Sequence, residues 1–188
     1  MPQGPRVAED RILAATLDII REQGLENLNV RGIAARIGCS TQPIMYRYKS
    51  VNVLLEHIYN YVADMHRQFI TGCADKPLTL IGAALAHIRF AEKEKHLFRF
   101  LFQTVQYKND FFEHLTSMDE TAVMVETLCQ QSKLSVEQGM KVLRTLMTCA
   151  HGAASLTANG SVGYDETALA EMLESTLNGA VSCVKEGR

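Results

Sequence analysis

The sequence predicts an all-α protein of about nine helices. Apolar residues recur at helical spacing almost throughout, no stretch alternates with a period of two, and capping residues stand where the apolar patterns begin and end. The chain has 188 residues, of which 47% are hydrophobic and 21% are charged. A chain of this size and composition can bury a core without disulfides or metals, and disorder is excluded for most of its length.

The first two helices are predicted from their apolar spacing and their ends. Apolar residues from Ile12 to Ile20 stop at Gly24, a residue type common just after a helix. Asn29 is a suitable N-cap for a two-turn helix that ends at Gly38. Both glycines are therefore expected to terminate helices.

A third short helix and a long fourth helix are predicted next. Ser40 is expected to cap the third helix, and Pro43 falls in its first turn, where the missing N–H has no helical partner in any case. Ser50 is expected to cap the fourth helix, whose apolar face runs from Leu54 to Phe69. The stretch from Gly72 to Pro77 interrupts the helical pattern and is a candidate domain boundary.

Five further helices are predicted in the rest of the chain. Ser135 and Gln138 have the spacing of a capping box, and Asp165 is a suitable N-cap for the last helix. The helices are expected over residues 78–90, 97–107, 110–131 and 136–158 and from Asp165 to Val184, with a break at Lys93-Glu94-Lys95 and a loop containing Asn159, Gly160 and Gly163.

The segment from Asn29 to Ser50 has the pattern of a helix-turn-helix. Two short helices flank a turn that contains glycine, and the second helix carries polar groups on most faces. No Asp or Glu occurs between Asn27 and Leu55, although the net charge of the whole chain is −2. Such a helix suits the major groove of DNA, which is roughly 12 Å wide. The predicted contact residues, with Arg6 in support, are Arg31, Thr41, Gln42, Pro43, Tyr46, Arg47 and Lys49.

Different roles are expected within this set. Thr41 and Gln42 are placed to reach base edges, whereas Tyr46, Arg47 and Lys49 can bond phosphate oxygens. The alternative interpretation is a solvated helix with a chance basic bias. The absence of acidic residues carries more information than the number of basic ones, because that number is close to average.

The same residues resemble a known family. The segment from Gly24 to Ser50, together with Ile12-Leu13-Ala14-Ala15 and Ile19-Ile20, is similar to the DNA-binding part of TetR-type transcriptional regulators. The segment from His151 to Leu156 resembles a short motif in the C-terminal domains of many members. Two positions differ from the usual pattern: Met45 stands where a tyrosine is common, and Tyr48 where phenylalanine is.

The resemblance implies a division of the chain and a function. The expected parts are a helix-turn-helix DNA-binding domain (1–50), a linker helix (51–73) and a ligand-binding and dimerisation domain (74–188). It further implies a homodimer on a pseudo-palindromic operator, usually a repressor that a small-molecule ligand releases. The competing function is an all-α enzyme or cofactor-binding protein, against which the acid-free segment argues.

A cluster of phenylalanines suggests where such a ligand would bind. Six of the seven lie between Phe90 and Phe112, and their ordinary interpretation is core and interface packing. The alternative is an apolar pocket with a few polar groups, taking an apolar or aromatic molecule. The candidate ligand-binding residues are His87, Phe90, Phe98, Phe102, Phe111, Met124 and His151.

The last two long helices are the predicted dimer interface, through a four-helix bundle. The helix over residues 136–158 offers small residues, and the last helix offers an apolar stripe. The alternative is that these two surfaces pack against each other within a single chain. The candidate interface residues are Ala150, Ala153, Ala154, Leu169, Leu173, Leu177 and Val181.

Other kinds of site are not supported by spacing. No histidine pair or cysteine cluster has metal-ligand spacing, and no catalytic constellation stands out, so we expect no enzyme activity, no metal and no cofactor. The five cysteines are widely separated and the N-terminus has no apolar segment. These features predict reduced thiols and a cytoplasmic location. Cys39, in the turn, is expected to be a small buried residue, with a redox role as the alternative.

Overall fold

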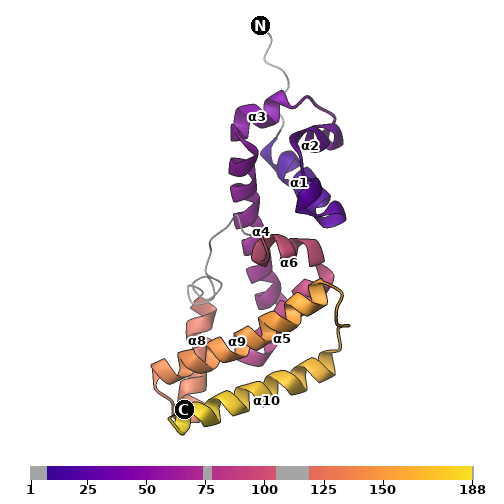
Figure 1. Ribbon diagram of the computed structural model, residues 1–188. Helices are drawn as coiled ribbons and strands as arrows, with labels where there is room; N and C mark the ends of the chain where they lie inside the picture. The colour runs from indigo at the N-terminus through magenta and orange to yellow at the C-terminus, as the bar shows by residue number, and fades with distance from the viewer. Residues whose placement is uncertain (1–7, 74–77, 105–118, 188) are drawn as a thin grey trace. The chain divides into compact units, whose positions relative to one another are not determined.

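The computed structural model describes residues 8–73, 78–104 and 119–187 (Figure 1). Within these ranges the chain forms nine α-helices and no strand, which confirms the predicted fold class. None of the described helices is long and apolar enough to cross a membrane. The helices are α1 (Glu9–Gln23), α2 (Val30–Ile37), α3 (Gln42–Tyr48), α4 (Val51–Cys73), α5 (Leu80–Lys93), α6 (Lys95–Phe102), α8 (Asp119–Ser132), α9 (Val136–Ala158) and α10 (Glu166–Lys185), with a short 3-10 helix at Leu25–Asn27.

Four predicted caps are confirmed. In each case a side-chain oxygen accepts a bond from a backbone N–H two or three residues further on, which satisfies a donor that the first helical turn leaves unpaired. Ser135 and Gln138 form the complete reciprocal capping box. The capping residues are Asn29 for α2, Ser50 for α4, Ser135 for α9 and Asp165 for α10.

Two predicted helix ends are wrong. Thr41, not Ser40, precedes α3, and its side chain makes no capping bond. The helix predicted to reach Tyr107 ends at Phe102, and the hydroxyl of Thr104, just beyond it, donates to the carbonyl of Phe100. Apolar spacing continues past this point, so the local pattern does not indicate the end. Residues 105–118, where the start of the 110–131 helix was predicted, lie outside the described ranges.

The described residues form two compact units. Unit 1 contains the chain up to Met65 together with Glu94–Thr104, and unit 2 contains His66–Lys93 and the described residues from Asp119 onward. By these contacts α6 groups with the N-terminal helices.

Unit 1 is built around isoleucines and two phenylalanines. Arg11 of α1 donates to the carbonyl of Ile37 at the end of α2, a favourable place for a cation. The guanidinium of Arg21 donates through Nε and Nη2 to the two carboxylate oxygens of Glu94, each 3.1 Å away, and so ties α1 to the start of α6. The described residues of unit 1 that are exposed by 1% or less are Ile12, Thr16, Ile20, Ile33, Ile44, Leu54, Ile58, Val62, Leu97, Phe98 and Phe100.

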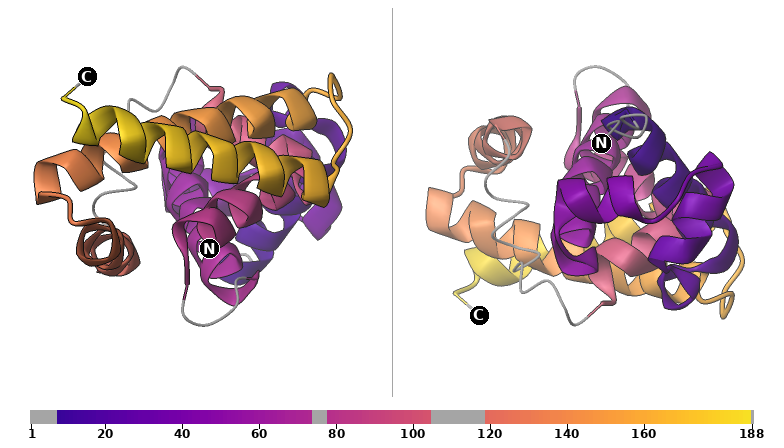
Figure 2. Two further views of the ribbon diagram at one scale, coloured as in Figure 1. Left: turned by 90° about the horizontal axis from the view of Figure 1, so that it is seen from below. Right: turned by 90° about the horizontal axis from the view of Figure 1, so that it is seen from above.

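Unit 2 is a stack of helices with small residues at the close contacts. Helix α9 packs against α5, α8 and α10, and Figures 1 and 2 show α9 and α10 lying side by side. Ala84, Ala91, Ala150 and Ala154 are fully buried, so these helices can approach closely. On α5, Arg89 donates through Nε to the hydroxyl of Tyr164 at 3.2 Å and also pairs with Glu166 at the start of α10.

Gly139 lies where α8 and α9 are in close contact. A Cβ at this position would overlap Sγ of Cys129 and would lie 3.2 Å from Cγ1 of Val125. We expect Gly139→Ala to lower the free energy of unfolding by about 1–3 kcal/mol, as overpacking does elsewhere. The double variant with Cys129→Ala removes the clashing sulfur and should recover most of this loss in denaturant unfolding. Because alanine also favours the helix more than glycine does, the decisive comparison is between backgrounds: an equal effect of Gly139→Ala with and without Cys129→Ala would contradict the close contact.

Candidate functional site

The segment from α2 to α3 has the geometry of a helix-turn-helix. Helix α2 ends at Gly38, whose φ of 78° lies in the left-handed region that glycine adopts without strain. The N–H groups of Gly38 and Cys39 both bond the carbonyl of Ala34, which closes the turn. After two further residues α3 begins at Gln42, with Pro43 in its first turn as predicted.

Two buried side chains fix the orientation of α3. Ile44 is 1% exposed and Tyr48 is 4% exposed, so one side of the helix is anchored in unit 1. Tyr46, between them, is 88% exposed, and Gln42 and Arg47 are exposed as well. The helix therefore presents hydrogen-bonding groups to solvent on the side away from its anchors.

The other predicted contact residues lie on the same helix-turn-helix segment. Arg31 is exposed in the first turn of α2, and Thr41 and Pro43 are half-buried at the start of α3. Lys49 is exposed and follows α3 with a φ of 57°, while its N–H bonds the carbonyl of Met45. Arg6 lies outside the described residues.

One acidic side chain reaches this surface from α1. Oε2 of Glu9 lies 2.6 Å from Nη1 of Arg47, and Oε1 lies 3.5 Å from the hydroxyl of Tyr48 and 3.4 Å from Nε2 of His57. Burial, followed by the nearby charge of Glu9, raises the pKa of Tyr48 above its ordinary value. Glu9 could not be predicted from the sequence, because it lies 38 positions before Arg47 and no local pattern links the two.

In unit 2, three histidines form a hydrogen-bonded chain. Nε2 of His66 lies 2.9 Å from Nδ1 of His87, and Nε2 of His87 lies 3.2 Å from Nδ1 of His151. The three residues come from α4, α5 and α9. His66 and His87 are buried and His151 is half-buried. The ring of Phe90 packs edge-on against His66, with the ring centroids 4.9 Å apart.

Burial disfavours the charged form of two of these histidines, His87 and His151. It is the main cause that lowers the pKa of His87 well below its ordinary value, and the neighbouring His66 and His151 lower it further. Burial also lowers the pKa of His151. His87 and His151 were predicted from the sequence as ligand-binding residues, but His66 was not. Its position four residues after Val62, on the apolar face of the fourth helix, was the available signal.

The predicted ligand-binding residues fall into separate groups. His87, Phe90 and His151 lie together in unit 2, and Phe98 and Phe102 lie in unit 1 with ring centroids 5.0 Å apart. Phe111 lies outside the described residues. In the described ranges, no group of three or more His, Cys, Asp or Glu side chains is arranged to hold a metal ion.

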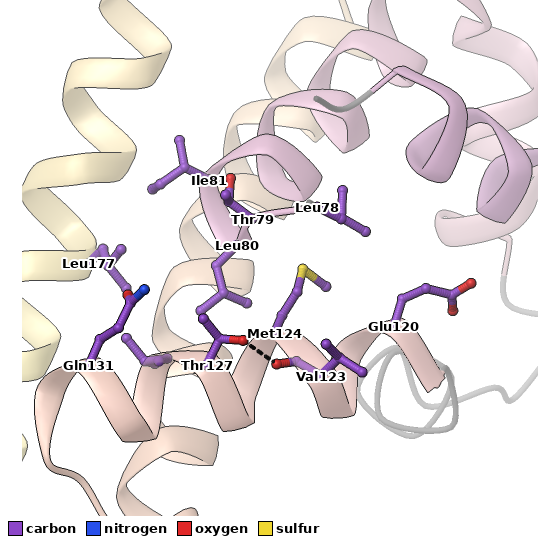
Figure 3. Close-up of a pocket in the computed structure, with 11 residues that line it drawn as sticks. Leu78, Thr79, Leu80, Ile81, Glu120, Val123, Met124, Thr127, Gln131 and Leu177 are labelled. Atoms are coloured by element: carbon purple, nitrogen blue, oxygen red, sulfur yellow. Dashed lines mark hydrogen bonds between the residues drawn. The ribbon is translucent and has the colours of Figure 1, made fainter. Parts of the chain in front are cut away.

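Met124, the remaining predicted ligand residue, lines a groove of about 380 Å³ in unit 2 (Figure 3). Leu80, Val123 and Leu177 supply much of its apolar wall, from α5, α8 and α10. Thr127 also lines it, but its hydroxyl donates to the carbonyl of Val123 at 2.8 Å. The groove is thus mainly apolar, and its lining does not include the histidine chain.

Comparison with known proteins decides the family. The family described as "Tetracyclin repressor-like, C-terminal domain" matches residues 80–182, which is more than half of the chain. The chain belongs to the TetR family. A search of curated proteins found no significant match.

Solved structures of other TetR-like proteins share the fold of this TetR-family chain. A TetR-like transcriptional regulator from Rhodococcus sp. RHA1 is 19% identical with a TM-score of 0.63, and the alignment covers 97% of this chain and 98% of that one. A transcriptional regulator from Pseudomonas aeruginosa PAO1, described as putative, is 15% identical with a TM-score of 0.67, covering 95% and 93%. A single-residue variant of TetR from Acinetobacter baumannii AYE, in complex with minocycline, is 17% identical with a TM-score of 0.59, covering 92% and 96%.

The predicted interface residues of the TetR-family chain differ in accessibility. Ala150, Ala154 and Leu173 are fully buried within unit 2, so their side chains are already covered in one chain. The other four predicted interface residues are half-buried and remain partly accessible on α9 and α10: Ala153, Leu169, Leu177 and Val181.

Proposed function

We propose that the chain is a sequence-specific DNA-binding transcriptional regulator that uses α3 as its recognition helix. The observation that carries the proposal is the outward face of α3. Tyr46 is 88% exposed beside exposed Gln42 and Arg47, while Ile44 and Tyr48 hold the helix in place. Residues 27–55 contain no acidic side chain that would repel phosphate. Membership of the TetR family supports the same function.

We further propose that the regulator is a homodimer on a pseudo-palindromic operator. Two-fold symmetry would present the two copies of α3 to half-sites about 34–36 Å apart. The accessible apolar side chains on α9 and α10, which include Leu169 and Val181, support a symmetric four-helix contact.

Repression relieved by a small apolar or aromatic ligand is also part of the proposal. Two features of unit 2 support it: the mainly apolar groove that contains Met124, and the buried cluster of Phe90 with the histidine chain. One of the similar solved structures is a complex with minocycline, so a related fold accommodates a small molecule. A ligand would lower operator affinity only by binding preferentially to the conformation that DNA disfavours.

Two substitutions test the assignment of α3. Lys49→Ala should weaken binding to all DNA sequences alike and lower the slope of log K against log salt concentration by about one unit, because one phosphate contact is lost. The φ of 57° is as unfavourable for alanine as for lysine, so the change removes charge without altering the backbone preference. Gln42→Ala should instead change sequence preference, as a base-edge contact would.

The measurement is a gel shift with genomic fragments, followed by fluorescence titration at several salt concentrations. A full-length chain that binds no fragment, even at low salt, would contradict the proposed function. If both variants bind a selected fragment as wild type does, the chain binds DNA through another surface. Nothing in the described residues favours the alternative of an enzyme or a cofactor-binding protein.

A further inference from the structure

The proposed DNA surface contains an internal carboxylate paired with one of its cations. Oε2 of Glu9 lies 2.6 Å from Nη1 of Arg47, which the sequence assigns to phosphate contact. Arg47 belongs to the acid-free stretch of residues 27–55, so this charge comes from outside the stretch, from the first turn of α1. The cation is therefore already occupied by an anion in the free protein.

The Glu9 carboxylate is held from more than one side. Its Oε1 atom lies 3.4 Å from Nε2 of His57 on α4 and 3.5 Å from the hydroxyl of Tyr48 on α3. The rings of Tyr48 and His57 meet edge to face, with centroids 6.0 Å apart, and Tyr48 is buried. The position of the Glu9 carboxylate beside Arg47 is therefore supported by Tyr48 and His57 as well.

The pair nevertheless remains open to a competing anion. The side chains of Arg47 and Glu9 are 41% and 36% exposed, so a DNA phosphate can approach the guanidinium. Carboxylate and phosphate are both acceptors for the same donor fork of arginine. A phosphate that contacts Arg47 must therefore displace the carboxylate or share the guanidinium with it.

We propose that Glu9 is a built-in competitor of DNA phosphate that lowers DNA affinity by holding Arg47 in the free protein. The proposal rests on the DNA-binding function proposed above and adds a residue that tunes it. The competition acts on a phosphate contact, so it affects the sequence-independent part of binding. Because specific and non-specific complexes both use phosphate contacts, the competition lowers the affinity for both kinds of DNA.

A double-variant cycle separates this competition from general repulsion between Glu9 and DNA. The probe is a fluorescein-labelled 30-base-pair duplex of mixed sequence, titrated with the full chain at 50 to 200 mM salt. The proteins are wild type, Glu9→Gln, Arg47→Gln and the double variant. Asp10→Asn is the matched control, because Asp10 is an exposed carboxylate in the same helical turn. Thermal melting of each protein verifies that it is folded.

Glu9→Gln should bind the duplex about two- to fivefold more tightly than wild type for each recognition helix that contacts DNA. This is the change in affinity expected when an exposed ion pair no longer has to be broken. Asp10→Asn should change affinity by a smaller factor. In the Arg47→Gln background, Glu9→Gln should have no larger effect than Asp10→Asn, because the cation for which Glu9 competes is gone.

The results that overturn the proposal are distinct from those that overturn the function. If wild type binds the duplex and Glu9→Gln is no tighter, or gains equally with and without Arg47, Glu9 is not a competitor for that cation. If no protein binds DNA at 50 mM salt, the proposed function fails and the competition fails with it.

Discussion

Replacing Leu173 by alanine should lower the free energy of unfolding by about 2–5 kcal/mol, the range seen when a buried leucine leaves a cavity. Leu173 is 0% exposed in unit 2, where α10 packs on α5 and α9. In a chain of this length the midpoint of thermal unfolding should fall by roughly 2–4 °C for each kcal/mol. Denaturant unfolding followed by circular dichroism measures the loss of free energy, and a thermal melt measures the midpoint.

The adjacent residue provides the control. Met172 is 36% exposed on the same helix, so Met172→Ala should cost far less stability than Leu173→Ala. Equal losses would contradict the burial of Leu173.

The burial of Leu173 also decides how the proposed dimer can be tested. A charge at Leu173 would unfold unit 2, whereas a charge at half-buried Val181 should leave the chain folded but monomeric, as measured by analytical ultracentrifugation.

Acidification should destabilise unit 2 through its histidine chain. Burial lowers the pKa of both His87 and His151, so below the ordinary histidine pKa of 6.5 the unfolded chain binds protons that the folded chain does not. Stability therefore rises with pH through this window and levels off above it. Each such histidine adds about 1.4 kcal/mol per pH unit to the slope, until the pH falls to its pKa in the folded state.

His87→Phe tests the origin of this pH dependence. The variant should be less stable than wild type at neutral pH, because His66 and His151 each lose a bonding partner in a buried site. Its loss of stability between pH 7 and pH 5 should nevertheless be smaller than that of wild type. His96→Phe, a half-buried histidine on α6, is the matched control. An unchanged slope in His87→Phe would show that other groups cause the acid sensitivity.

Much of the secondary structure was predictable from local signals, although Ser40 was wrongly expected to cap α3. Asn29, Ser135 and Asp165 are capping residues within three residues of the N–H groups they bond, and Gly38 ends α2 through its own conformation. These features depend on the identities of neighbours along the chain, so spacing and residue type are sufficient to find them. A helix end without such a signal, that of α6 at Phe102, was missed, because apolar spacing continues past it.

The candidate sites were only partly predictable, because their chemistry depends on residues distant in sequence. The face of α3 could be predicted from Ile44 and Tyr48, which are buried, and Tyr46, which is exposed. The pairing of Glu9 with Arg47 could not, and neither could the alignment of three histidines from three helices. Long-range pairs of this kind have no fixed spacing, so they emerge only when the helices are packed.

The membership of α6 in unit 1 limits how the protein can be cut and recombined. A fragment that stops after α4 would lose Glu94, which pairs with Arg21, and Phe100, which packs edge-on against Tyr59 with the ring centroids 6.0 Å apart. The apolar surface that α6 covers in unit 1 would then be bare. A chimera that grafts these N-terminal helices onto a foreign effector domain therefore needs the α6 of this chain as well. Gene fusions designed on a simple N-terminal boundary would produce an aggregation-prone module.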